Sequence, residues 1–319
     1  MEEILKMKKG FLMVMALCLV MVVWGTALGA DTADIVFVVD ESGSMRGEHA
    51  WLGNMVMDLE SGLAAEGVQN NQYALVGFGG NHYHGPEGHK HAVGGGDWGS
   101  ANELSAAASS LVANGAFEDG WEAIDFALDN YNFRGNAAVN FILITDEDRD
   151  ILDSTLTYSS ILNELSSKDV LLNSVVNAVF RDNEESRLLG MSGERFDENG
   201  DKITDPAGNP ITGYAQDPSD PTNYVGVSGA YATEDYYSTT IDDYVDLALD
   251  TGGAAWDLNQ LRAGGNTATA FTKAFIDIKV AEIQQQDPGQ PNPIPEPSTI
   301  LLLGIGLAGA CVVRKKMIK

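Results

Sequence analysis

The chemistry of this sequence is concentrated in residues 40–44, which read Asp-Glu-Ser-Gly-Ser. Asp40, Ser42 and Ser44 present one carboxylate and two hydroxyls at alternate positions, and these are the hard oxygen ligands that Mg²⁺, Mn²⁺ or Ca²⁺ prefers. The segment directly follows Ile35–Val39, an apolar, β-branched run that predicts a strand buried on both faces. A divalent-cation site is therefore expected in the loop that ends this strand.

A second acidic loop follows the apolar run Phe141–Thr145 and begins at Asp146. Ligands of open parallel sheets bind where the strands end, so Asp146 and the Asp40 loop are expected at the same edge. Glu147, Asp148 and Asp150 crowd the second loop. They are interpreted as a solvated acidic rim, with an adjacent calcium site as the alternative.

Strand-like and helix-like blocks alternate from residue 34 onward, which predicts an α/β fold with a mostly parallel sheet covered by helices on both faces. The predicted strands are Ile35–Val39, Tyr73–Phe78, His89–Val93, Val139–Thr145, Val170–Phe180 and Ala254–Leu258. The predicted helices are Met45–Glu66, Ser100–Ala113, Gly120–Tyr131, Thr155–Lys168, Ile241–Asp250 and Thr267–Ile283. The short loop before His89–Val93 predicts one antiparallel edge strand.

Residues 181–240 interrupt this alternation and are rich in Gly, Pro, Asp and Asn. So long a connection is unusual, and Asn199-Gly200 is a type I′ hairpin signal, so a hairpin-rich insertion near the site is expected. Its role cannot be read from the sequence. Asp197–Asp201 resembles an EF-hand loop only superficially, because its glycine is misplaced and Gly208 stands where the final glutamate belongs.

Both ends of the chain look like targeting segments. Residues 1–30 combine three lysines, an apolar stretch and small residues, which is the pattern of a secretory signal peptide; a permanent anchor is the alternative. Residues 285–294 form a polar, Pro-rich linker. Residues 295–319 read Pro-Glu-Pro, followed by a short apolar segment and a basic tail. A GPI-anchor signal is the competing interpretation, but such a signal does not normally end in a basic cluster.

The C-terminal segment resembles the PEP-CTERM sorting signal. The resemblance implies processing by an exosortase in a Gram-negative bacterium, with membrane contact only through this segment before cleavage. The expected location is the cell surface or extracellular matrix. Both cysteines, Cys18 and Cys311, lie in the two end segments, so residues 31–294 have neither thiol nor disulfide.

The chain is strongly acidic, with a formal net charge of −27. Without residues 1–30 and 295–319, 12 basic and 43 acidic residues give a net charge near −31. Such a surface repels nucleic acid and anionic lipid and attracts divalent cations, so no nucleic-acid partner is expected.

Residues 31–284 resemble a von Willebrand factor A domain with a metal-ion-dependent adhesion site, the D-x-S-x-S motif being Asp40 to Ser44. The resemblance implies a Rossmann-like fold in which Ser42 and Ser44 bind the cation directly while Asp40 and Asp146 act through water. Most members supply a threonine from a third loop, but here Glu118 occupies that position, as in integrin β-subunits. Glu118 is the expected fifth ligand, unless it saturates the ion or merely caps the next helix.

A histidine cluster lies in residues 82–91, with imidazoles at His82, His84, His89 and His91. Transition-metal binding is conceivable there, but an exposed hairpin with no fixed ion is the preferred interpretation. No nucleophile, zinc-protease or phosphate-binding motif is found, so a non-enzymatic role is expected.

The expected function is ion bridging: a divalent cation, with Mg²⁺ preferred and Mn²⁺ or Ca²⁺ possible, accepts an acidic group from a surface protein or exopolysaccharide. The alternative is a structural matrix component whose metal only stabilises the fold. A hydrolase that uses the histidine cluster is the third candidate. The sequence leaves open the partner's identity, the ion and the oligomeric state.

Overall fold

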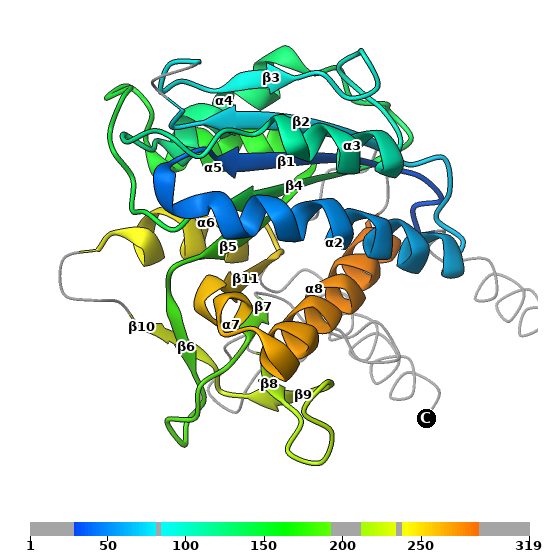
Figure 1. Ribbon diagram of the computed structural model, residues 1–319, viewed down its shortest axis with the longest axis vertical. Coiled ribbons are helices and arrows are strands. Elements are labelled where there is room, and N and C mark those ends of the chain that lie inside the picture. The colour runs from blue at the N-terminus through cyan, green and yellow to red at the C-terminus, as the bar shows by residue number, and fades with distance from the viewer. Residues whose placement is uncertain (1–28, 81–83, 193–211, 234–237, 287–319) are drawn as a thin grey trace, which may run out of the picture.

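The computed structural model describes residues 29–80, 84–192, 212–233 and 238–286. Five parallel strands form the centre of a nine-stranded sheet (Figure 1): β1 Ala33–Asp40, β2 Gln72–Phe78, β4 Ala138–Ile144, β5 Val170–Val176 and β11 Ala254–Asp257. The strand order is β3-β2-β1-β4-β5-β11-β7-β8-β9. The predicted α/β class and its mostly parallel sheet are confirmed.

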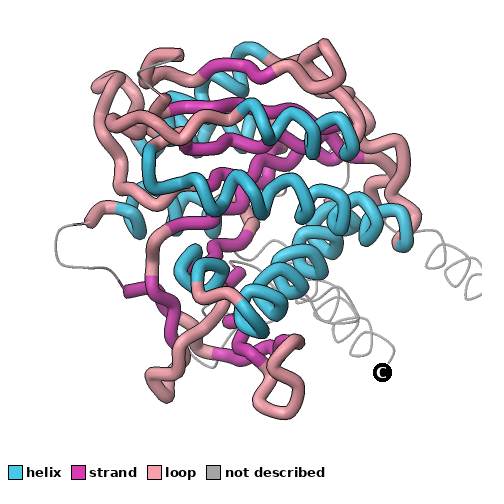
Figure 2. Tube along the Cα trace, in the orientation of Figure 1, coloured by secondary structure: helices cyan, strands magenta, loops and turns pink. Residues whose placement is uncertain are grey.

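Helices cover both faces of this sheet, as Figures 1 and 2 show. One face packs against α2 Arg46–Ala65, α3 Ala101–Ala107, α7 Leu258–Arg262 and α8 Gly265–Gln285. The other packs against α4 Gly120–Asn130, α5 Tyr158–Ser167 and α6 Asp246–Asp250. Successive side chains of β1 alternate between the two cores, so its residues 35–39 are all apolar, and every residue of the strand is buried.

The predicted antiparallel edge strand is β3, His89–His91, which pairs with β2. A difference from the sequence prediction is that residues 181–240 add antiparallel strands at the opposite edge: β7 Gly190–Ser192, β8 Thr212–Gln216 and β9 Tyr224–Ser228. Two further strands, β6 Val179–Arg181 and β10 Tyr231–Thr233, form a small separate sheet. The insertion thus extends the sheet beyond β11.

Short helical segments complete the described chain. They are η1 Gly43–Met45, η2 Ala108–Ser110 and the π-helical η3 Ile241–Val245. The single strand predicted at Val170–Phe180 is interrupted between β5 and β6, and α7 was not predicted because five residues carry no readable periodicity.

Several sequence predictions lie wholly or mainly outside the described residues. These are the signal peptide, the Asn199-Gly200 turn, the Asp197–Asp201 loop, His82, the linker beyond Gln286 and the sorting segment. Within the described ranges, no helix has the length and apolar character that a membrane crossing requires.

The last described residue, Gln286, is fixed at the amino end of the parallel strands. Its side chain accepts a hydrogen bond from Asn140 Nδ2 at 2.6 Å and donates one to the carbonyl of Val139 at 3.3 Å, both residues being near the start of β4. The Asp40 loop follows the other end of β1, which runs parallel to β4. The linker therefore begins at the end of the sheet opposite to the candidate site.

Candidate metal centre

Asp40 ends β1, and its carboxylate is completely buried. Oδ1 accepts a hydrogen bond from the Ser42 N–H at 2.6 Å, and Oδ2 accepts one from the Thr145 hydroxyl at 2.8 Å. Thr145 directly follows β4, so this contact joins the ends of two neighbouring strands. The His49 ring donates to the Asp40 carbonyl oxygen at 2.8 Å. The carboxylate is thus held in one orientation.

A chain of oxygen atoms connects the first and second loops. Ser42 Oγ lies 3.0 Å from Ser44 Oγ, and the Ser44 hydroxyl donates to Asp146 Oδ1 at 2.8 Å. Ser42 is buried, whereas Ser44 is exposed. The two serine hydroxyls and the Asp146 carboxylate are therefore adjacent at the surface. The sequence predicted this proximity, although Ser44 and Asp146 are 102 residues apart in the chain.

Neither serine hydroxyl is used as a helix cap. Ser42 precedes η1 and Met45 precedes α2, but no side-chain capping hydrogen bond is made at either position. Ser44 therefore does not cap the following helix. Both hydroxyl oxygens keep lone pairs that a cation could use.

Glu118 lies beside Asp40, on the third loop. A Cβ added to Gly79 would stand 3.2 Å from Asp40 Oδ1 and 3.7 Å from Glu118 Oε1, so the two carboxylates border the same small space. Gly79 has φ +74°, a left-handed conformation that favours glycine. The cap of α4 is Asp119, whose carboxylate accepts from the N–H groups of residues 121 and 122. Glu118 is therefore not the helix cap.

The two carboxylates have strongly shifted acidities. Burial raises the pKa of Asp40 to about 7, against the opposing hydrogen bonds from Ser42 and Thr145. Burial, assisted by the negative charge of Asp40, raises the pKa of Glu118 to about 8. Among the described residues, no Lys, Arg or His forms an ion pair with either group. Buried carboxylates without a cationic partner favour a positive ion between them.

Arg262, at the end of α7, was not recognised from the sequence. Its guanidinium donates to Asp146 Oδ2 at 2.8 Å and to Glu48 Oε1 at 2.7 Å. It thereby turns Asp146 Oδ1 toward Ser44 and joins the second loop to α2. No local motif marks this residue, since its partners are distant in sequence.

Arg149 was also missed, and it holds the second loop against the third. Its guanidinium makes two hydrogen bonds to the Asp119 carboxylate, at 2.6 and 3.0 Å, and lies 4.0 Å from the centre of the Trp121 ring. Asp150 also accepts the Glu118 N–H at 3.2 Å. Asp150 thus positions the Glu118 backbone.

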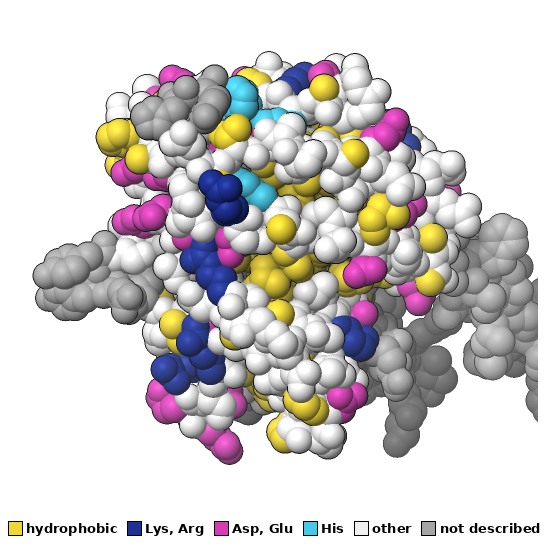
Figure 3. Space-filling model, viewed as in Figure 1, with side chains coloured by type: hydrophobic (Ala, Val, Ile, Leu, Met, Phe, Trp, Pro, Cys, Tyr) yellow, Lys and Arg dark blue, Asp and Glu magenta, His cyan; other side chains and the backbone are white. Residues whose placement is uncertain are grey.

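Beside this centre lies a second cluster, which contains Glu41, His84, His89 and His91. One ligand atom from each residue lies within 4.8 Å of the others, so these side chains converge, whereas the interpretation preferred from the sequence was an exposed hairpin with no fixed ion. Histidine side chains reach the surface near β3 at the top of Figure 3. Burial acts to raise the pKa of Glu41, but the contacts with His89 and His91 outweigh it and lower the pKa below its ordinary value.

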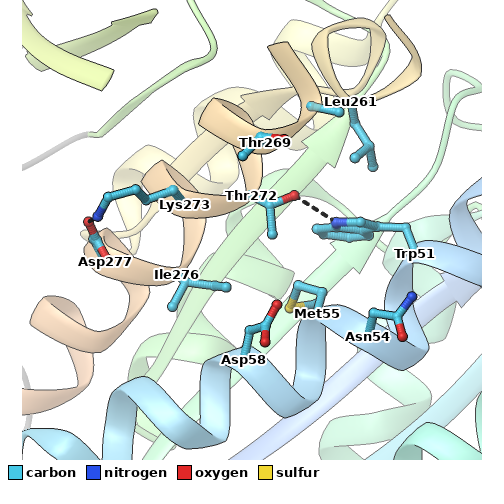
Figure 4. Close-up of a pocket in the computed structure, with 11 residues that line it drawn as sticks. Trp51, Asn54, Met55, Asp58, Leu261, Thr269, Thr272, Lys273, Ile276 and Asp277 are labelled. Carbon is cyan, nitrogen blue, oxygen red and sulfur yellow. Dashed lines mark hydrogen bonds and ion pairs between the residues drawn. The ribbon is translucent and has the colours of Figure 1, made fainter. Parts of the chain in front are cut away.

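A hollow with a volume of about 520 Å³ lies elsewhere, between α2 and α8 (Figure 4). Trp51 crosses it and donates from Nε1 to the Thr272 hydroxyl at 3.0 Å. None of the five predicted ligands lines it. A surface cation site needs no deep cavity, so the hollow does not bear on the metal centre.

Residues 293–315 match the family model of the PEP-CTERM protein-sorting motif. No curated protein sequence is significantly similar to this chain.

Solved structures give only weak likenesses. Two structures of proximal thread matrix protein 1 from the mussel byssus, one with a zinc-occupied MIDAS motif, show 17% and 18% identity and TM-scores of 0.35 and 0.36. Each comparison covers 47% of this chain and 36% of the mussel chain, so this protein spans about a third of that structure. The hypothetical protein BatB from Bacteroides thetaiotaomicron shows 14% identity and a TM-score of 0.40 over 78% of this chain and 99% of that one.

The assignment of the fold therefore depends on the strand order and on the Asp40 loop at the end of β1, and not on these scores. Since the sorting motif is independently matched, its implication of export applies to the whole chain. The chain joins an α/β domain, in which the Asp40 loop follows the central strand β1 as the resemblance to von Willebrand A domains implies, to a segment that matches the PEP-CTERM protein-sorting motif, which implies an exported protein.

Proposed function

We propose that this protein is a non-enzymatic binding protein of the cell surface or extracellular matrix, which uses a divalent cation to bind an acidic group. The ligands would be Asp40, Ser42, Ser44, Glu118 and Asp146. The partner would be a surface protein or an exopolysaccharide. Mg²⁺ is the preferred ion, because all five side chains offer hard oxygen atoms.

The observation that carries the proposal is the gathering of oxygen atoms from three loops at one edge of the sheet. Ser42, Ser44 and Asp146 are linked by contacts of 3.0 and 2.8 Å, while the buried carboxylates of Asp40 and Glu118 share the space beside Gly79. Because Asp40 and Glu118 have no cationic partner among the described residues, a bound cation would remove their mutual repulsion.

The bound cation would supply Lewis-acid attraction for a partner's carboxylate. By the family resemblance, Ser42 and Ser44 would hold it directly, and Asp40 and Asp146 would hold its water molecules. Thr145 fixes the orientation of Asp40, and Arg262 fixes that of Asp146. Ser44 is exposed, so a partner's carboxylate can approach this point.

The orientation of the domain also supports a binding role. The Asp40 loop and Gln286 lie at opposite ends of the parallel sheet. The site therefore faces away from the point where the linker to the sorting segment begins. A partner could reach the site while the C-terminal segment is engaged by the sorting machinery.

Ser42→Ala tests the proposal, with Ser61→Ala as the matched control. Ser61 lies on α2, is exposed and donates only to the Met57 carbonyl. We expect wild type and Ser61→Ala to bind beads coated with polygalacturonate or polyglutamate in Mg²⁺ and to release them in chelator. Ser42→Ala should lose most of this binding.

The second candidate, a structural matrix component, predicts a different pattern. Chelation and Ser42→Ala would then lower the melting temperature by similar amounts, while retention on either polymer would be weak and unaffected by Mg²⁺. Measuring bead retention and melting temperature on the same samples separates the two candidates. Retention that persists in chelator would contradict both.

A further inference from the structure

Glu41 lies at the centre of the histidine cluster, and its side chain is completely buried. Its Oε2 is 2.8 Å from His89 Nε2 and 3.5 Å from His84 Nδ1, and its Oε1 is 3.1 Å from His91 Nε2. Ligand atoms around a tetrahedral zinc ion stand about 3.3 Å apart, because each lies about 2.0–2.1 Å from the metal. The three distances to Glu41 lie on either side of this value, and the four ligand atoms lie within 4.8 Å of one another.

The proton positions of two of the imidazoles are fixed by neighbouring groups. His89 Nδ1 lies 3.1 Å from the carbonyl oxygen of Glu87, which can only accept, so Nδ1 carries the proton. Ser110 donates its hydroxyl proton to the Ala107 carbonyl at 2.6 Å, so its oxygen accepts from His91 Nδ1 at 2.9 Å. In each neutral ring, Nε2 is therefore the nitrogen with a free lone pair.

These two Nε2 atoms are buried and make no hydrogen bond. Although both lie within ion-pair distance of Glu41, neither is aligned to donate a hydrogen bond to its carboxylate. When both rings are neutral, two nitrogen lone pairs face a buried carboxylate, which is unfavourable without a positive charge between them, a charge that a ring proton or a metal ion can supply. Outer contacts that fix the tautomer of a histidine are typical of metal ligands.

The strand geometry makes room for an ion at this place. His89 and His91 are two residues apart on β3, so both side chains are on the same face of the edge strand. Gly77 pairs with His89 on the neighbouring strand β2. A Cβ at Gly77 would come within 2.5 Å of Glu41 Oε2 and 2.7 Å of His91 Nε2, so the glycine leaves the centre of the cluster open.

Access is provided from one side only. The side chains of His84 and His89 are 35% and 20% exposed, whereas those of His91 and Glu41 are almost completely buried. The three rings are tilted relative to one another, at 47° to 86°, with centroids 4.4 to 5.4 Å apart. The three rings surround a common point and do not stack, an arrangement that allows all three to bind one metal ion.

We propose that Glu41, His84, His89 and His91 form a transition-metal site that binds Zn²⁺ and is distinct from the oxygen-lined adhesion site. Imidazole suits Zn²⁺ and Co²⁺, whereas Mg²⁺ prefers oxygen, so the two sites differ in ion preference. Because Glu41 lies between Asp40 and Ser42, the metal would fasten the adhesion loop to β3.

Titration with Co²⁺ tests this site, because tetrahedral cobalt gives strong visible absorption. The full chain should bind one Co²⁺ with this spectrum, and Zn²⁺ should displace it. His89→Gln should lower the affinity by at least about 100-fold, since loss of an outer contact alone costs about 10–100-fold. His84→Ala, which alters the most exposed ligand, should lower affinity without endangering the fold.

Two controls distinguish this site from the adhesion site. Ser61→Ala alters an exposed residue of α2 outside both sites and should leave Co²⁺ binding unchanged. Ser42→Ala should weaken Mg²⁺ binding but retain the cobalt spectrum, so the two proposals can fail separately. A wild-type protein without tetrahedral cobalt absorption, or equal affinities in wild type, His89→Gln and His84→Ala, would overturn the inference.

Discussion

At the scale of single residues, the centre is defined by the buried carboxylates of Asp40 and Glu118, which form no ion pair with a cationic side chain among the described residues. Asp40, Ser42, Ser44 and Asp146 were predictable, because each belongs to a short loop directly after an apolar strand. Glu118 was found by its place in a family motif, and its position next to Asp40 agrees with that. Thr145 and the tautomers in the histidine cluster were not predictable, because they depend on contacts across strands.

The acidity of Asp40 gives a prediction about pH. Folding raises its pKa from 3.8 to about 7, so its contribution to stability is fully present below about pH 4 and is lost as the pH rises through about 7. We expect the melting temperature of the metal-free protein to fall between about pH 4 and about pH 7. Asp40→Asn should make this fall smaller, and Mg²⁺ should restore the wild type at the higher pH.

The comparison of wild type with Asp40→Asn is needed because other groups titrate in the same range. Burial lowers the pKa of His49, while contacts with Glu41 raise that of His89 against the effect of burial. These two histidines are present in both proteins and cancel in the difference, whereas Glu118, whose pKa is raised by burial and by the charge of Asp40, contributes to the difference together with Asp40. Identical pH profiles for the two metal-free proteins would contradict this account of Asp40.

At the scale of elements, the site is built where parallel strands end, and helices fix its loops from outside. Alternation of apolar runs made β1, β2, β4 and β5 predictable. The insertion was not predictable in detail, because β7 and β8 become strands only through pairing with β11 and with each other. The five-residue α7 positions Arg262 beside the site, and no motif in the sequence of this helix predicts that role.

The substitution Arg262→Gln tests the role of α7 at the site. It removes a positive charge from Asp146, so we expect tighter Mg²⁺ binding. It also leaves the nearly buried Glu48 without its partner, so the unfolding free energy should fall by about 1–3 kcal/mol. Calorimetric Mg²⁺ titration and urea denaturation measure the two effects.

Lys273→Gln is the matched control for Arg262→Gln. Lys273 forms an exposed pair with Asp277 on α8, and such pairs contribute only about 0.3–0.5 kcal/mol. Weaker Mg²⁺ binding in Arg262→Gln would show that the guanidinium supports the site by orienting Asp146 more than it competes with the ion.

At the scale of the whole molecule, the candidate metal site and the sorting signal belong to different parts of the chain. The metal-binding loops lie at one end of the sheet, and the chain leaves the domain at the other, beside Asn140. The composition predicted an acidic exported protein, and the match over residues 293–315 supports export. The partner is not encoded in any single motif, since a cation accepts carboxylates of many kinds.

Deletion of residues 293–315 tests whether the sorting motif directs the location of the protein without affecting the folded domain. In a bacterium with an exosortase, the shortened protein should appear in soluble fractions, while the full chain enters the envelope fraction. Its melting temperature and Mg²⁺ affinity should match those of the processed protein, because processing removes the same segment. Equal distribution of both proteins between fractions would contradict the role of the motif.

The most direct measurement is an anomalous difference map from crystals of the protein soaked in Mn²⁺. The account predicts a peak within ligand distance of the Ser42 and Ser44 hydroxyls, with Asp40, Glu118 and Asp146 around it. The adhesion site would be contradicted if crystals soaked in saturating Mn²⁺ showed no peak there. It would also be contradicted if the only Mn²⁺ peak lay at the Glu41 cluster.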